Sequence, residues 1–330
     1  MGNCCATSQP EQQLTLSPPD PLVLNSKSFL NKPPSDHQVE IYQEVYQTHA
    51  PKPDLAKEIM TLPPIINFNT LHLLSELGPF KYSPSFDANF EEFPELLAYE
   101  FIYLPGVIYK GQWRSGERHG KGSQYWPDGS LYEGYWEFDK ANGKGRLIHG
   151  DGDAYEGEWR NDKANGYGIY IDMNGLRYEG EFYEDRPHGF GKEVWNDGMV
   201  YEGGYLLGKK DGKGKMIWQD GEFYEGEFRE NDREGYGIYE WIDGRKYEGE
   251  WRGNQMHGKG VFVWGDGRKY VGEWKRNKKE GFGVFEWDGK KYKGAWKMGK
   301  MDGDGSWIGE NGGEKKGIWK EGKLVNWNEN

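Results

Sequence analysis

Residues 247–269 read YEGEWRGNQMHGKGVFVWGDGRK, and this stretch decides the fold. From Tyr247 to Trp251, aromatic residues and glycine alternate with glutamate, which is the pattern of a β-strand with one apolar and one wet face. Residues 260–264 alternate in the same way and predict a second strand. The Asp-Gly pair that follows favours the positive φ of a tight hairpin turn. The stretch therefore predicts one antiparallel hairpin.

The same stretch recurs along most of the chain at an almost constant pitch. A tyrosine opens each unit, one unit is shorter by a residue, and a tenth, degenerate unit has Lys315 where tyrosine is expected. A period of this size is typical of a stacked array in which no unit has a core of its own. We therefore expect residues 106–330 to form an all-β repeat array of about ten units, as one elongated, single-layer, twisted antiparallel sheet of successive hairpins. The opening tyrosines are Tyr109, Tyr132, Tyr155, Tyr178, Tyr201, Tyr224, Tyr247, Tyr270 and Tyr292.

Glycine and tryptophan are confined to the repeats. Of the 50 glycines only Gly2 and Gly78 precede residue 101, and all 15 tryptophans follow it. A glycine without a side chain leaves room for an aromatic ring to lie over bare backbone. We therefore predict that an aromatic face replaces a two-layer core, in a chain whose mean hydropathy is only −0.96.

The motif of the unit resembles a known family. Tyr-Glu-Gly-Glu-Trp, then Gly-x-Gly, then Trp-x-Asp-Gly is similar to the membrane occupation and recognition nexus (MORN) repeat, over about residues 106–322. The departures are local: other residues replace the first or second tryptophan of five units. The resemblance implies a slightly twisted groove that binds partner helices or membranes, in the cell cortex, at membrane junctions or in cilia, and it implies no catalysis. The departures are Phe182, Tyr205 and Phe228 at the first tryptophan, and His149 and Asp172 at the second.

The amino terminus carries a lipidation signal. Gly2 follows the initiator Met and is a candidate for myristoylation, and Cys4 and Cys5, the two cysteines of the chain, are candidates for palmitoylation. A single acyl chain binds membranes weakly, so stable anchoring needs a second signal. Because no basic cluster accompanies Gly2, this second signal must be another acyl chain. We expect residues 1–34, rich in Pro, Ser and Gln, to form an acylated flexible tether. The alternative is a tail with free thiols.

Residues 35–105 are expected to be partly helical. Ser35 or Asp36 could begin one helix that ends near Pro51, and Thr70 could cap a second over 71–77. Pro94 could open a third over 95–102. The first strand of the sheet would otherwise be an open edge, so we expect residues 62–105 to pack on that edge or in the groove. The alternative is a loose tail.

Several classes of function are excluded by composition and motif. Residues 1–100 carry five Lys, no Arg and 13 acidic residues, and the rest is also net negative, which disfavours nucleic acid as a partner. There is no phosphate-binding loop, kinase signature or nucleophile elbow. There is also no run of about 20 apolar residues and no secretory signal. We predict a non-enzymatic protein without a cofactor, at the cytoplasmic face of a membrane; the resemblance adds the cortex or a cilium as its setting.

Histidine does not predict a metal site. His119, His188 and His257 occupy the same position in units that lie three repeats apart. At about 4.8 Å a strand they would be about 30 Å apart, too far to share an ion. We expect them to be exposed loop residues.

The aromatic residues of the central units are the first candidate site. They have two interpretations: they hold the sheet together, or they are partly exposed and anchor an amphipathic partner helix along a groove. The residues predicted to line this groove are Trp241, Trp251, Phe262, Trp264, Trp274 and Phe285.

Basic residues between the two strands of a unit are the second candidate site. They could contact anionic lipid headgroups, worth about 1 kcal/mol for a well-placed cation, or they could form a solvated edge that prevents aggregation. The candidates are Lys209, Lys210, Lys213, Lys215, Lys275, Arg276, Lys278 and Lys279.

The leading hypothesis from the sequence is a scaffold that acyl chains tether to a membrane and that presents an aromatic groove to protein partners. The alternatives are a module that binds phosphoinositides or other anionic lipids through its basic loops, and a structural component of the axoneme.

Overall fold

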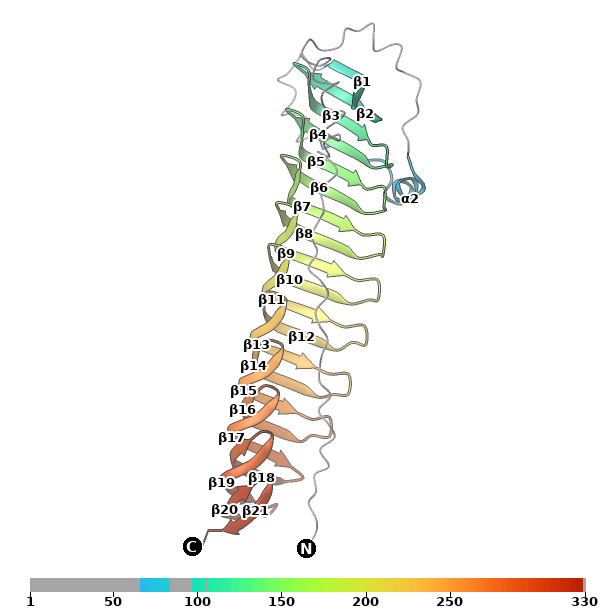
Figure 1. Cartoon of the computed structure of the whole chain (residues 1–330). Coiled ribbons are helices and arrows are strands. Elements are labelled where there is room, and N and C mark those ends of the chain that lie inside the picture. The colour runs from blue at the N-terminus through green and yellow to red at the C-terminus, as the bar shows by residue number, and fades with distance from the viewer. Residues whose placement is uncertain (1–65, 84–96, 105, 329–330) are drawn as a thin grey trace.

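The computed structural model describes residues 66–83, 97–104 and 106–328. Within these residues there are one helix, α2 (Phe68–Leu77), and 21 strands in a single sheet. Each strand pairs antiparallel with the strand before it and the strand after it, so the array is a continuous meander that forms a long rod (Figure 1). The expected all-β array of hairpins is confirmed. The strands are β1 (Leu97–Leu104), β2 (Val107–Arg114), β3 (Glu117–Tyr125), β4 (Leu131–Glu137), β5 (Lys140–Ile148), β6 (Ala154–Arg160), β7 (Lys163–Ile171), β8 (Arg177–Tyr183), β9 (Arg186–Val194), β10 (Val200–Leu206), β11 (Lys209–Ile217), β12 (Phe223–Arg229), β13 (Asp232–Glu240), β14 (Lys246–Arg252), β15 (Gln255–Val263), β16 (Lys269–Lys275), β17 (Lys278–Trp287), β18 (Lys290–Lys297), β19 (Lys300–Ile308), β20 (Glu314–Lys320) and β21 (Lys323–Trp327).

Two kinds of turn alternate along the rod. Inside a unit, β14 and β15 are joined by Gly253 and Asn254, both with positive φ, which is the geometry of a two-residue hairpin turn. Between units, the N–H of Gly267 donates to the carbonyl of Trp264 at 2.9 Å, and Gly267 has φ +89°. The Asp-Gly pairs therefore make the turns predicted from the sequence.

The two glycines of Gly-x-Gly have different roles. Gly258 has φ +53° at a β-bulge, and Glu250 accepts the following N–H, that of Lys259, at 2.9 Å. Gly260 pairs with Gly249, and the ring of Tyr247 lies over both glycines. Because these two glycines have no Cβ atom, the ring of the opening tyrosine can lie directly against the backbone, as the sequence predicts.

The core is a zipper of aromatic rings that follows the axis of the rod. The ring of Tyr247 meets Trp251 of its own unit edge-on, with centroids 5.1 Å apart, and Trp274 of the next unit at 5.6 Å. The same pair of contacts recurs from Tyr109 to Tyr292. Each such contact contributes roughly 0.5–1.5 kcal/mol beyond its buried area. The aromatic face, defined as the face onto which the opening tyrosines point, therefore supplies the core.

The first units are covered by the segment before them. β1 pairs with β2, so the edge at Tyr109 is closed by a strand, and the helix predicted over 95–102 is wrong because residues 97–104 are extended. Helix α2 confirms a helix near 71–77, but Asn67 rather than Thr70 is its N-cap. Thr70 instead donates its hydroxyl to the carbonyl of Gly129 at 2.7 Å, which fixes the helix on the Asp-Gly turns. The helix expected to end near Pro51 and the tether lie outside the described residues.

Candidate functional site

Most of the predicted groove lies inside the core. Trp241, Trp251, Phe262 and Trp274 are between 2% and 6% exposed. Of the six residues predicted to line the groove, Trp264 and Phe285 are half-buried and offer surface. A partner can therefore contact two of the six, while the other four act through stability.

A hydrogen bond holds the first tryptophan of a central unit in its buried position. The indole Nε1 of Trp251 donates to the carbonyl of Gly237 in the preceding unit at 3.1 Å, and Trp274 donates likewise to Gly260 at 3.4 Å. The indole of Trp251 is thus bonded to the preceding unit and meets edge-on the tyrosines of both that unit and its own. Sequence alternation identifies the face of a strand but not the depth of a ring beneath its neighbours.

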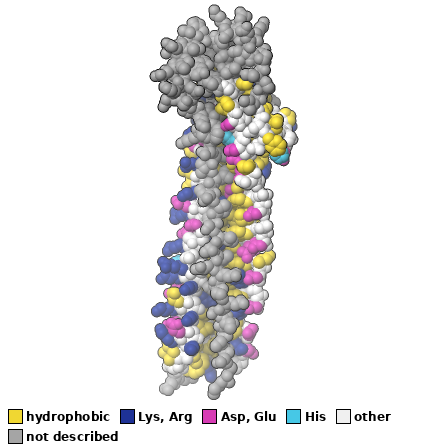
Figure 2. Space-filling model, turned by 45° about the vertical axis from the view of Figure 1, so that its right-hand side comes forward, with side chains coloured by type: hydrophobic (Ala, Val, Ile, Leu, Met, Phe, Trp, Pro, Cys, Tyr) yellow, Lys and Arg dark blue, Asp and Glu magenta, His cyan; other side chains and the backbone are white. Residues whose placement is uncertain are grey.

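A stripe of half-buried rings remains accessible beside the core. We call this set the aromatic stripe; its members come from the second strand of each unit and the turn that follows, and they pack against the core cluster. Hydrophobic side chains form a band along the rod in Figure 2, and Lys and Arg side chains gather along one edge of the molecule. The aromatic stripe consists of Trp126, Tyr170, Trp195, Trp218, Trp264, Phe285, Trp287 and Trp307.

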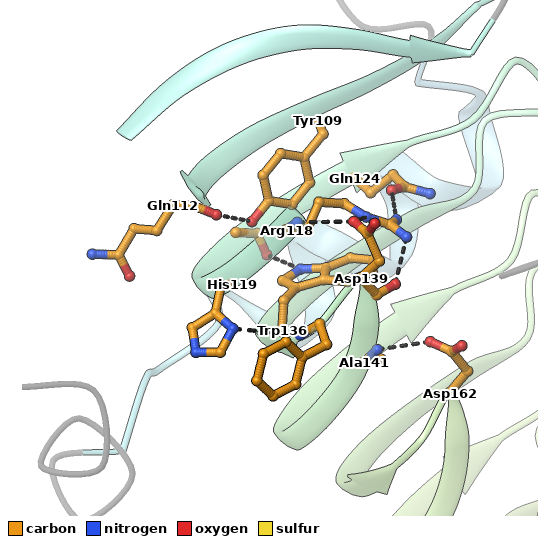
Figure 3. Close-up of polar contacts among 11 residues, drawn as sticks. Tyr109, Gln112, Arg118, His119, Gln124, Trp136, Asp139, Ala141 and Asp162 are labelled. Carbon is orange, nitrogen blue, oxygen red and sulfur yellow. Dashed lines mark hydrogen bonds and ion pairs between the residues drawn. The ribbon is translucent and has the colours of Figure 1, made fainter. Parts of the chain in front are cut away.

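Cations are buried on the aromatic face at one position of the repeat, nine residues after the opening tyrosine. Figure 3 shows Arg118 between Tyr109 and Trp136, with its guanidinium carbon 4.1 Å from the centroid of the Trp136 ring. Its Nε donates to Asp139 at 3.0 Å and its Nη1 donates to Gln124. The cation is thus enclosed by rings and neutralised by an acid.

Lys210 occupies the same position and is not available to a lipid headgroup. It is 4% exposed, and its Nζ donates to Glu193 at 2.9 Å. The same Nζ lies 4.8 Å from the centroid of the Trp195 ring. The prediction of Lys210 as a lipid contact is therefore wrong, because its charge is paired inside the sheet.

Lys279 is the second cation at this position, after Lys210, that the sequence suggests as a contact for lipid headgroups. Its Nζ lies 4.6 Å from the ring of Trp264 and 4.7 Å from that of Phe285, so it packs under the aromatic stripe and is half-buried. Lys215 is half-buried and pairs with Glu225 at 3.0 Å on the opposite face. The candidates that remain exposed are Lys209, Lys213, Lys275, Arg276 and Lys278.

Asp or Asn in the hairpin turn braces neighbouring units, a feature that sequence reasoning missed. The side chain of Asn277 accepts the N–H of Met256 at 2.7 Å, and its own N–H donates to the Met256 carbonyl at 3.1 Å. Asp162 accepts the N–H of Ala141 in the same way (Figure 3). The signal was present, since Asp or Asn recurs seven residues after the opening tyrosine in most units. The braces fix the spacing of the turns that flank the aromatic stripe.

The opposite face carries exposed rings that sequence reasoning also missed. They stand between the two glycines of Gly-x-Gly, where the side chain points away from the tyrosine core. Each is more than half exposed, and Tyr236 donates its hydroxyl to Glu248 at 2.9 Å. An aromatic residue in the middle of Gly-x-Gly was the available signal. These residues are Tyr167, Phe190, Tyr236 and Phe282.

The histidines do not form a site. His119 is 2% exposed, which contradicts the expected loop position; its ring packs edge-on against Phe138, and burial lowers its pKa. His188 and His257 are half-buried. In the described part of the chain no group of three or more His, Cys, Asp or Glu side chains could hold a metal ion.

None of the helices in the described segments has the length and apolar character needed to cross a bilayer. Gly2, Cys4 and Cys5, the predicted lipidation sites, lie outside the described residues.

Comparison with solved structures gives distant likenesses. The TCP10 domain of Danio rerio CPAP in complex with a peptide of Danio rerio STIL is 12% identical, with 64% of this chain and 95% of that chain covered and a TM-score of 0.39. The SAS-4 (dCPAP) TCP domain of Drosophila melanogaster, in complex with a proline-rich motif of Ana2 (dSTIL), is 13% identical, with 58% and 92% covered and a TM-score of 0.30. Likenesses this weak carry no argument about function. No curated protein matches the chain.

The model of the MORN repeat matches nine consecutive units. The matched residues are 109–131, 132–154, 155–177, 178–200, 201–223, 224–244, 247–267, 270–289 and 292–314. These units span more than half of the chain, and each has the hairpin, the paired glycines and the buried tyrosine described above. The chain therefore belongs to the MORN repeat family, a non-catalytic family of repeat proteins.

Proposed function

We propose that the chain is a scaffold that acyl chains on Gly2, Cys4 and Cys5 tether to the cytoplasmic face of a membrane, and that it holds a protein partner along the aromatic stripe. The observation that carries this proposal is the stripe itself. Its rings are half-buried, so they combine accessible apolar surface with a fixed orientation. Aromatic anchors of this kind dominate the binding energy of protein interfaces.

The form of the stripe favours an elongated partner. Successive rings come from successive units, so a ligand that follows the rod meets one anchor after another. An amphipathic helix presents its apolar residues in the same linear fashion and suits such a surface. The cations packed below the rings, such as Lys279 below Trp264 and Phe285, hold the anchors in place and favour an acidic partner.

Partner capture by matched variants tests the proposal. Proximity labelling in the native cell would first identify neighbours of the full chain. Trp264→Ala with Phe285→Ala should lower capture of the true partner by at least about 2 kcal/mol, since both rings are accessible anchors. Tyr236→Ala is the matched control, because it removes an exposed ring from the opposite face. Undiminished capture by the folded double variant would show that the stripe is not the binding surface.

Binding of anionic lipids is the second candidate function. Lys275, Arg276 and Lys278 are exposed and consecutive on one turn edge, apart from Asn277 between them. Flotation of unacylated protein with vesicles that contain phosphoinositide separates the two functions. Charge reversal of these three residues should abolish flotation if lipid binding is the function, at about 1 kcal/mol for each cation. The scaffold proposal expects no flotation of the unacylated chain.

A further inference from the structure

A short segment of the chain lies on the opposite face of the first units, the face that points away from the opening tyrosines. Helix α2, beside the first units of the rod, brings the segment there, because Leu73 of the helix packs against Ile148 on that face (Figure 1). In residues 79–83, Phe80 and Tyr82 are half-buried, whereas the residue between them is exposed. The segment therefore turns two rings, two residues apart, toward the sheet, as an extended backbone does.

The contacts of these two rings define what the opposite face can hold. The ring of Tyr82 meets that of Tyr135 edge-on, with centroids 5.3 Å apart, and the Nζ of Lys121 lies 5.2 Å from the centroid of the Tyr82 ring. The hydroxyl of Tyr135 donates to the carbonyl of the residue after Tyr82 at 2.9 Å. The guanidinium carbon of Arg146 lies 5.7 Å from the centroid of the Phe80 ring. Strands β3, β4 and β5 thus bind an extended segment with aromatic residues at alternate positions.

The same positions carry apolar residues six repeats later. Val271 takes the place of Glu133, and Val284 takes the place of Arg146. Val271 is paired directly with Val261 on one side and with Val284 on the other. These three residues, which we call the valine row, therefore lie next to one another across β15, β16 and β17.

The valine row is accessible, and the fold does not require it. Val271 is 40% exposed, and Phe282, two residues before Val284 on the same face, is 52% exposed. At the position of Val271 six other units have glutamate, so an apolar residue is not needed there to build the array. These glutamates are Glu133, Glu156, Glu179, Glu202, Glu225 and Glu248.

We propose that the valine row and Phe282 form a second docking surface, which takes an extended segment of a partner protein with aromatic residues at alternate positions. One ring of the partner lies on the valine row, at the place that Phe80 has in the internal segment. The other lies beside Lys259, which has the place of Lys121 in the repeat. This surface is on the other side of the sheet from the aromatic stripe, so the inference goes beyond the proposed function and does not rest on it.

The surroundings favour such a partner over a second copy of the chain or an anionic membrane. The aromatic segment of each copy is already held on its own first units, where the side-chain amide of Asn67 donates to the carbonyls of Asp128 and Gly150 at 2.9 and 2.7 Å. The valine row is bordered by Glu248 at one end and by Lys293 at the other. Neither sign of charge dominates, which suits an apolar aromatic segment.

A peptide with the sequence of the internal segment tests the surface. The probe is acetylated and amidated Gly-Pro-Phe-Lys-Tyr-Ser, the sequence of residues 78–83, titrated into the full chain with isotope-labelled valine methyl groups. We expect chemical-shift changes at the methyl groups of Val261, Val271 and Val284, because an aromatic ring shifts the resonances of methyl groups that it contacts. A peptide in which alanine replaces both aromatic residues should leave these signals unchanged.

Val271→Glu tests the valine row with a residue that the array already accepts at this position. The melting temperature should stay the same, while the affinity for the peptide should fall at least about tenfold, because the peptide must cover a charge that has no partner. Phe282→Lys should also weaken binding, and Lys121 and Lys144 hold the same place in other units. Phe190→Lys is the matched control, since it removes an exposed ring from the same face in a unit without the valine row.

Three results would overturn the inference. The first is no shift of the valine methyl signals, or the same shift with the alanine peptide. The second is an affinity that survives Val271→Glu in folded protein. The third is self-association of the full chain, measured by analytical ultracentrifugation, that Val271→Glu abolishes, since the occupant would then be a second copy. Failure of the proposed function is distinguishable, because Trp264→Ala with Phe285→Ala changes the aromatic face and should leave the affinity for this peptide unchanged.

Discussion

The hydroxyl oxygen of Tyr247 lies so close to Gly260 that a Cβ atom on this glycine would stand 2.4 Å from it. The same hydroxyl donates to the carbonyl of Glu250 at 2.9 Å, so the ring is fixed over the glycine by its own strand. The ring fills the space that a side chain on the glycine would occupy. This relationship recurs in every unit that begins with tyrosine, and it makes the second glycine of Gly-x-Gly a packing residue.

Gly260→Ala should destabilise the array, because the new methyl group must displace the Tyr247 ring from the zipper. Overpacking of this kind costs typically about 1–3 kcal/mol, and thermal melting would measure it. Gly253→Asn is the control: Gly253 has φ +53° and open space around its Cβ position, and Asn tolerates that backbone conformation. Equal melting temperatures for the two variants would contradict the packing role.

Alkaline pH should unfold the array through the same tyrosines. Burial raises the pKa of Tyr292 to about 12 from its ordinary value of 10.0, and it raises the pKa of Tyr247 and Tyr270 further. A raised pKa means that the folded state favours the neutral phenol. The contribution is therefore complete below the unfolded pKa of 10.0 and is lost as pH rises through the folded values. Melting temperatures should fall steeply above about pH 10, and a constant value up to pH 12 would contradict this origin of stability.

Membrane residence should depend on the amino terminus. Gly2→Ala, or Cys4→Ser combined with Cys5→Ser, should shift the protein to the soluble fraction, because one acyl chain alone binds reversibly. Fractionation of cells that express the full chain measures the shift. Charge reversal of Lys275, Arg276 and Lys278 is the control and should leave the distribution unchanged. Acylation-deficient variants that stay fully membrane-bound would exclude the tether.

The array should behave as a rod of about 100 Å in solution, since ten units of two strands each advance about 10 Å a unit. Small-angle scattering of residues 97–330 would give an elongated particle, with a cross-section far smaller than its length. A near-spherical profile would be incompatible with a sheet in which every strand pairs only with its sequence neighbours.

The sequence predicts the fold well because the unit is redundant. Alternation in YEGEW, the Asp-Gly turns and the fixed pitch each indicate hairpins, and the paired glycines indicate rings over backbone. The prediction fails outside the repeats, where no periodic motif guides it. Residues 97–104 have helix-compatible composition, yet they form a strand because β2 offers an unpaired edge. A long-range pairing of this kind leaves no mark in local sequence.

The candidate site is harder to predict because depth is a property of neighbouring units. Trp251 and Trp264 have the same residue type on the same face, but Trp251 is buried against the tyrosines of its own and the preceding unit, whereas Trp264 is half-buried. Lys210 has the sequence signature of an exposed cation, and only its contact with Glu193 of the preceding unit reveals that it is internal. Periodicity identifies faces, whereas exposure requires the stacking of units.

Pairing of each strand with its chain neighbours alone has a consequence for how such a molecule changes over time. In the described sheet each strand pairs with its chain neighbours, so gain or loss of one 23-residue segment would require no strand to find a new kind of partner. Recombination between units that share the motif could therefore lengthen or shorten the rod in steps while leaving both ends intact. The distance between the first strand and the last ring of the stripe is thus a quantity that selection can adjust by copy number, without a change in the residues of any one unit.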